Sequence, residues 1–258
     1  MEKESKIYAF IKAIEKPYFN SFINEGQICM STAKWFREYE GIDDNIGDAG
    51  EGAITSCGNG FTVSFADPID NYSSEEELKE KLKKSQWSKP LSGVNLRMFD
   101  RNNANILSLY AITALDINGK AHKHLVPKKF IDEFSNHRFV LILNPKNFIE
   151  RIANTLNRLN KSPIGGMVKY YPLDNKMRSN LTFFHKQERY SYQHEYRLIF
   201  QDENPEKKII NIGALDDICM EIDLNRHCYV KTIDNIELTI IRDDKYIIEE
   251  KTRHNSGS

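Results

Sequence analysis

The stretch YSYQHEYRLIF, residues 190–200, begins by alternating aromatic residues with polar or charged ones. Successive side chains of a β-strand point to opposite faces of its sheet. A strand here places one set on a core face: Tyr190, Tyr192, His194, Tyr196, Leu198 and Phe200. The other face then carries Gln193, Glu195, Arg197 and Ile199. That second row is either a solvated ion pair on the surface of the sheet or the floor of a functional site.

The composition is that of a globular protein. The chain has 258 residues, of which 40% are hydrophobic and 28% charged, with a formal net charge of -1. A balanced charge argues against bulk electrostatic attraction to nucleic acid but leaves a local basic groove open. The four cysteines lie far apart without a C-x-x-C pair, which argues against a zinc site or a disulfide scaffold.

The location of the protein is predicted from two features that the sequence does not show, a signal peptide and a membrane-spanning stretch. The opening MEKESKIYAF carries charges where a signal peptide has an apolar run, and no stretch reaches the roughly 18 apolar residues of a membrane span. We therefore expect a cytoplasmic protein with no membrane partner.

Around this stretch, strands outnumber helices and do not alternate with them regularly. Helical signals cover residues 17–26, 33–40 and 145–160, strand signals cover 6–11, 105–113 and 137–144, and a hairpin is expected from 53–57 with 61–65. This order predicts an α+β fold, a single domain over residues 1–250 with one or more mostly antiparallel mixed sheets and flanking helices. Residues 251–258 are expected to be a disordered tail.

A loop rich in glycine and acids, residues 41–52, follows the helix of residues 33–40. Its glycines allow backbone N–H groups to approach a ligand closely, and its acids favour a hydroxyl or a cation over a phosphate. Asp44, Asp48 and Glu51 are candidate oxygen ligands for Mg²⁺ or Ca²⁺, but the EF-hand register fails, and no metal ligands are assigned. A plain surface loop is the alternative.

The segment before residue 190 is also polar. His185, Lys186, Glu188 and Arg189 crowd together, and Glu195 and Arg197 share a strand face. A glutamate held by an arginine stays ionised at neutral pH. Such a carboxylate can hold a ribose hydroxyl, stabilise an oxocarbenium-like centre or activate a nucleophile.

These segments resemble a family of bacterial proteins found beside phage-defence and toxin genes. The resemblance rests on F-x-x-F-x-x-x-G-x-I-x-x-S at residues 19–31 and W-F-R-x-x-E at 35–40. It also rests on Gly47, Asp48, Glu51 and Gly52, and on the late residues His185, Lys186, Tyr192, Glu195 and Arg197. The layout is also distantly similar to the DarT-like ADP-ribosyltransferases, which modify nucleic acid with NAD. The adjacent residues of HEY, 194–196, are not the His-Tyr-Glu set of that fold, which comes from three strands.

The transferase resemblance implies an ADP-ribosyltransferase-like fold with NAD as substrate. By similarity, Glu195 is the catalytic glutamate, Arg37 contacts the phosphates or ribose of NAD, and Tyr8 or Tyr110 stacks on the nicotinamide. The remaining cofactor contacts are expected from Ser31, Asp48, Glu51, His185, Lys186 and Arg197. The acceptor is expected to be a nucleic acid or a protein, and an antitoxin or defence-system partner is expected as well.

Two other functions fit the same sequence. One is a non-catalytic binding or sensor module of a defence system, which would be favoured by an exposed Glu195 without a cleft beside it. The other is a nuclease that uses Asp44, Asp48 and Glu51 with Mg²⁺.

Overall fold

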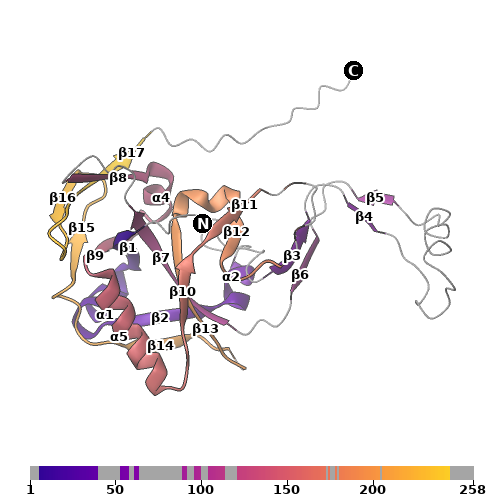
Figure 1. Cartoon of the computed structure of the whole chain (residues 1–258), viewed down its shortest axis with the longest axis horizontal. Coiled ribbons are helices and arrows are strands. Elements are labelled where there is room, and N and C mark those ends of the chain that lie inside the picture. The colour runs from indigo at the N-terminus through magenta and orange to yellow at the C-terminus, as the bar shows by residue number, and fades with distance from the viewer. Residues whose placement is uncertain are drawn as a thin grey trace.

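The fold is built from many strands and few helices (Figure 1). The computed structural model describes residues 6–39, 53–57, 61–63, 89–91, 96–99, 104–113, 121–172, 174, 178, 180–203 and 205–244. Within these residues most strand pairs are antiparallel, which confirms the expected α+β class.

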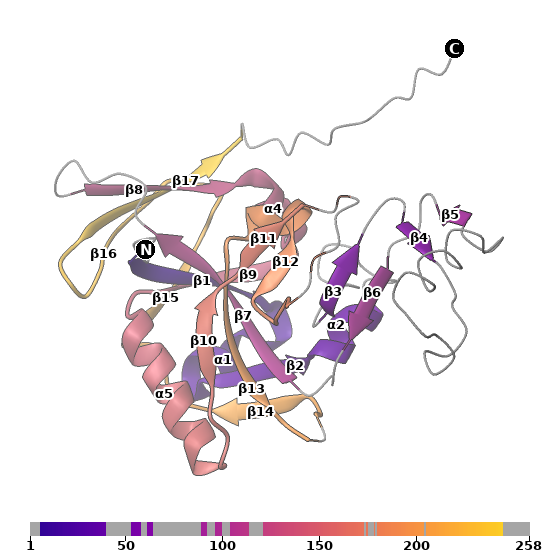
Figure 2. The same ribbon diagram turned by 45° about the vertical axis from the view of Figure 1, so that its right-hand side comes forward.

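An eight-stranded antiparallel sheet forms the body of the protein (Figure 2). Its main order is β10-β13-β7-β1-β9-β15, while β14 pairs with β2 and β2 pairs with β7. The strands are β1 Ile7–Glu15, β2 Gln27–Thr32, β7 Ala104–Thr113, β9 His137–Ile142, β10 Ile164–Met167, β13 Glu195–Gln201, β14 Lys208–Asn211 and β15 Cys219–Ile222.

Four smaller sheets accompany the large one. They combine β3 Ala53–Cys57 with β6 Leu96–Phe99, β4 Phe61–Val63 with β5 Lys89–Leu91, β11 Lys169–Tyr171 with β12 His185–Gln187, and β16 Cys228–Lys231 with β17 Glu237–Asp243 and β8 Ala121–Pro127. The expected hairpin of β3 and β4 is wrong, because β3 pairs with β6 and β4 pairs with β5 instead of with each other.

Within the described residues, the helices are short except for α5. They are η1 Lys16–Tyr18, α1 Phe19–Glu25, α2 Ala33–Tyr39, α4 Lys128–Glu133, α5 Pro145–Arg158 and η3 Glu188–Gln193. Gly26 ends α1 in the left-handed region with φ 60°, and Asn144 caps α5 by accepting from the Asn147 N–H. Among the helices of the described ranges, none is long and apolar enough to cross a membrane.

The two faces of the large sheet are packed differently. Leu107 and Leu109 point to a core that also contains Leu198, Phe200 and Phe148 of α5. The alternate residues of β7, Ser108 and Tyr110, therefore point to the opposite face, as the period of two requires.

The strand expected over residues 190–200 begins at Glu195. Residues 188–193 form η3, and His194 follows with φ 39°, in the left-handed region, so the alternation of the aromatic side chains does not extend to Tyr190 and Tyr192. Tyr196, Leu198 and Phe200 share the core face as expected.

The large sheet splits beside β7. β1 pairs with β7 as far as Ile11 opposite Tyr110, and β2 pairs with β7 at Ser31 opposite Ile106. No described strand pairs with residues 107–109 on this edge of β7. β1 continues beyond Ile11 paired with β9 alone, so β1 and β2 diverge and leave a notch over the middle of β7.

Candidate functional site

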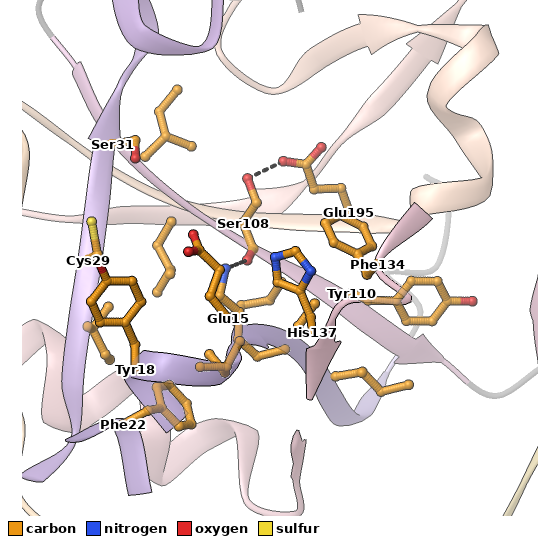
Figure 3. Close-up of a pocket in the computed structure, with 18 of the residues that line it drawn as sticks. Glu15, Tyr18, Phe22, Cys29, Ser31, Ser108, Tyr110, Phe134, His137 and Glu195 are labelled. Atoms are coloured by element: carbon orange, nitrogen blue, oxygen red, sulfur yellow. Dashed lines mark hydrogen bonds between the residues drawn. The ribbon is translucent and has the colours of Figure 1, made fainter. Parts of the chain in front are cut away.

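The notch between β1 and β2 holds a cavity of about 370 Å³. Its walls come from residues 11–15 of β1, residues 106–110 of β7 and several residues of β2. Glu195 and Ser108 lie beside one another across from Cys29 and Ser31 of β2 (Figure 3). This volume is in the range of small-molecule sites.

Lys12 stands where β1 leaves β7. Its Nζ donates to the carbonyl oxygen of Ser108 at 2.9 Å, which supplies this part of β7 with a partner in place of a strand. Burial lowers the pKa of Lys12, while Cys29 and the carboxylate of Glu195 raise it in part. Lys12 is not among the expected site residues, because the first strand is predicted to end at residue 11.

Glu195 sits on the floor of the cavity, with four donor contacts. Its Oε1 accepts from the hydroxyl of Ser108 and from Nε of Arg197, the latter at 2.7 Å. Its Oε2 lies 3.3 Å from both Nη2 of Arg197 and Nζ of Lys186. Glu195 is 4% exposed and Arg197 is 1% exposed, so the interpretation of a solvated ion pair is wrong.

The charge of Glu195 is set by opposing effects. Burial raises its pKa, but the charges of Arg197 and Lys186 and the hydrogen bonds from Arg197 and Ser108 outweigh burial and hold the pKa well below its usual range. The side chain is therefore a carboxylate at neutral pH, as the sequence predicts. Arg197 is fixed in turn by donating from Nη1 to the carbonyl of Phe183.

The backbone of Glu195 is held in place on both sides. Its N–H donates to the hydroxyl of Tyr170 at 2.9 Å, and its carbonyl accepts from the N–H of Val168 at 2.8 Å. The left-handed turn at His194 brings the chain from η3 into β13, and the carbonyl of His194 accepts from the N–H of Ala111 at 2.9 Å. These contacts aim the carboxylate at the cavity without relying on a flexible loop.

Four of the residues expected from the sequence line this one cavity: Ser31, Tyr110, Lys186 and Glu195. They come from β2, β7, β12 and β13, and all but Lys186 and Glu195 are far apart in the sequence. Arg197 is buried, does not line the cavity, and donates a hydrogen bond to Glu195. The convergence of residues from separate segments is what a ligand site requires.

Three other expected residues lie outside the lining. Arg37 is half-buried on α2, Tyr8 lies on β1 with Nζ of Lys6 at 5.3 Å from its ring centroid, and Nδ1 of His185 lies 3.1 Å from the N–H of Thr182. Burial lowers the pKa of His185, with the charge of Lys169 acting in the same direction.

The acidic loop is not covered by the structure. Asp44, Asp48 and Glu51 lie outside the described residues, as does the rest of residues 41–52. Within the described ranges no group of three or more His, Cys, Asp or Glu side chains is placed to hold a metal ion.

An aromatic wall on α2 forms one side of the cavity. Trp35 and Tyr39 are stacked with ring centroids 4.5 Å apart, and Phe36 meets Trp35 edge-on at 5.1 Å. All three line the cavity. Thr32 starts this helix by accepting from the N–H of Trp35 at 3.1 Å, which fixes the position of the wall. None of the three was among the candidate site residues expected from the sequence.

No family model, curated protein or solved structure matches the chain. The function is therefore inferred from the chemistry of the cavity.

Proposed function

We propose that the cavity binds NAD and that the chain is an ADP-ribosyltransferase-like effector acting on a nucleic acid or a protein. One observation carries the proposal: a buried, ionised glutamate, Glu195, lines a cavity of about 370 Å³. A carboxylate in that setting stabilises positive charge as it develops on a bound sugar.

The two oxygens of Glu195 differ in a way that suits a sugar. Oε1 has a contact with Nε of Arg197 at 2.7 Å and a hydroxyl bond from Ser108, whereas both contacts of Oε2 are longer, at 3.3 Å. A carboxylate accepts about four hydrogen bonds, and Glu195 already has four contacts, so a ribose hydroxyl would replace one of the two long contacts of Oε2. Oε2 is the oxygen that accepts from a ribose hydroxyl in the proposed complex.

Aromatic and cationic side chains supply the remaining contacts. Tyr110 lines the cavity and Tyr8 does not, so Tyr110 is the residue proposed to stack on the nicotinamide. Lys12, Lys186 and Lys207 bring ammonium groups to the lining and are suited to the phosphates of NAD.

The proposed reaction is a substitution at the ribose. The bond between the ribose carbon and the nicotinamide nitrogen breaks, and nicotinamide leaves with the electron pair. Glu195 stabilises the resulting oxocarbenium ion, and a nucleophilic atom of the acceptor then forms the new bond while its proton passes to solvent. Arg197 and Ser108 keep Glu195 ionised throughout.

The ADP-ribosyltransferase-like fold, a cytoplasmic role in phage defence and an antitoxin or other defence-system partner belong to the same proposal. The fold is supported by the antiparallel sheet with a carboxylate on a late strand, whereas the role in defence and the partner rest on the resemblance of the opening and closing segments alone. Glu195 is buried beside a cavity, which favours an enzyme. A non-catalytic sensor module fits an exposed Glu195 better.

Isothermal titration of NAD onto the purified chain tests the binding step. We expect a dissociation constant between about 1 µM and 1 mM, the usual range for enzyme substrates. Lys12→Met is expected to weaken binding at least about tenfold because a charge-assisted contact is lost. Lys146→Met, which removes an exposed ammonium on α5, is the matched control and should bind as the wild type does. An absence of binding by folded wild-type protein, together with no release of nicotinamide, overturns the proposal.

A further inference from the structure

A chain of polar side chains leads from Glu195 to a second carboxylate, Glu133, at the end of α4. Nζ of Lys186 lies 3.3 Å from Oε2 of Glu195 and donates to Oε1 of Gln193 at 2.7 Å. Nε2 of Gln193 then donates to Oε1 of Glu133 at 3.3 Å. Lys186 and Gln193 are buried, so this chain runs through the interior.

The donor and acceptor roles in this series of hydrogen bonds are fixed by the residues at its two ends. An ammonium group only donates, so Gln193 must offer its amide oxygen to Lys186. The amide NH₂ then points to Glu133, whose carboxylate accepts. With Glu133 in place, one of the two orientations of the Gln193 amide satisfies both neighbours, and the reverse orientation satisfies neither.

Glu133 itself is held on one oxygen only. The hydroxyl of Tyr192 also donates to Oε1, at 3.0 Å. Oε2 is buried and has no hydrogen-bond partner in the described part of the chain. A buried carboxylate oxygen without a partner is costly when charged, and it is a suitable place for a proton.

We propose that Glu133 is a positioning residue of the candidate site, which fixes the Gln193 amide and, through it, holds the ammonium group of Lys186 against Glu195. The effect of Glu133 on a reaction rests on the proposed function. The coupling of Glu133 to Gln193 and Lys186 through hydrogen bonds does not. Glu133 does not line the cavity, so it acts through the other residues and not on the substrate.

Protonation of Glu133 changes the charge around Glu195. With Glu133 ionised, the two carboxylates balance Arg197 and Lys186, and with Glu133 protonated the group carries one positive charge. Burial raises the pKa of Glu133 to about 7, although bonds from Tyr192 and Gln193 and the charges of Lys186 and Lys129 lower it in part. Glu133 therefore gains or loses its proton near neutral pH.

The other elements around Glu133 do not obscure this titration. Lys129 faces it from α4, Lys186 from β12, and Tyr192 and Gln193 from η3. β8 also packs against α4, and burial together with His194 lowers the pKa of its His124 to about 4. Burial also raises the pKa of Tyr192, so neither His124 nor Tyr192 is expected to change its charge near pH 7.

Nuclear magnetic resonance of the full chain without ligand tests the coupling. The side-chain amide of Gln193, identified by its loss in Gln193→Leu, and the ammonium nitrogen of Lys186 are followed from pH 5.5 to pH 8.5. We expect both signals to shift with one midpoint near pH 7 in the wild type. Glu133→Gln should abolish this shift, and Asp132→Asn, an exposed acid on the same helix, should leave it unchanged.

Two results overturn the inference: signals of folded wild-type protein that stay flat across this range, or a titration that survives in Glu133→Gln. The wild-type titration alone tests the inference if Glu133→Gln does not fold. If the wild type binds no NAD, the proposed function fails while the titration still tests the coupling. If it releases nicotinamide, the pH profile of kcat should lose its inflection near pH 7 in Glu133→Gln.

Discussion

Ser108 on β7 donates its hydroxyl hydrogen to Oε1 of Glu195 on β13, 87 positions later in the chain. The strand register pairs Ser108 with Arg197 and Glu195 with Tyr110, so the bond is diagonal across the two strands. The carbonyl of the same serine accepts from Lys12 of β1. Ser108 therefore joins the three neighbouring strands at the point where the large sheet splits.

Ser108→Ala should lower turnover without unfolding the protein. Oε1 of Glu195 loses a donor, and a hydrogen bond to a charged group contributes about 1.5–3 kcal/mol. If the bond acts in the transition state, kcat falls by roughly 10- to 100-fold. Steady-state release of nicotinamide measures this effect, with Ser135→Ala, outside the cavity, as the control. Unchanged kcat in Ser108→Ala would contradict the role given to this hydroxyl.

Arg197→Met should destabilise the fold strongly. The substitution leaves the carboxylate of Glu195 buried with fewer partners, and breaking a buried pair in this way costs about 3–5 kcal/mol. Urea unfolding followed by circular dichroism measures the free energy of unfolding. Lys146→Met removes one partner of an exposed pair with Glu150 and should have a much smaller effect. If the two variants lowered the free energy of unfolding equally, the buried pair would contribute no more to stability than the exposed one.

His124 should make the fold sensitive to acid. Burial, aided by His194, lowers its pKa from 6.5 to about 4, so between these values the unfolded chain binds more protons than the folded one. Stability is then complete above pH 6.5 and is lost as pH falls towards 4, by an amount on the order of 3 kcal/mol.

Urea unfolding at pH 7 and pH 4.5 tests this dependence. His124→Gln should show a smaller loss between the two values than the wild type, because the glutamine side chain does not titrate. His227→Gln, which removes an exposed histidine, should retain the wild-type loss. The same loss in all three proteins would exclude His124 as the cause.

The sequence predicted the elements with strong local patterns. The helical signals over residues 17–26 and 145–160 correspond to α1 and α5, with Gly26 at the end of α1 and a proline at the start of α5. The alternation of Glu195 and Arg197 with Tyr196 and Leu198 gave the two faces of β13. In each case the signal lies within a few residues of the feature that it predicts.

Features that depend on distant parts of the chain were not predicted. The left-handed conformation of His194, which starts β13 later than expected, depends on contacts of that residue with Ala111 on another strand. The burial of Glu195 depends on Lys186, Ser108 and Arg197 together, whereas alternation alone fits a wet surface equally well. The role of Lys12 follows from the split of the sheet, which no local pattern encodes.

The release of nicotinamide from NAD by the wild type and by Glu195→Gln is the most direct test of the central claim. The glutamine keeps the size of the side chain but not its charge, so we expect nicotinamide release to fall by at least about 100-fold. Glu221→Gln, which removes an exposed carboxylate paired with Arg138, should retain the wild-type rate. A folded Glu195→Gln protein that releases nicotinamide at the wild-type rate would contradict the assignment of Glu195 as the catalytic carboxylate.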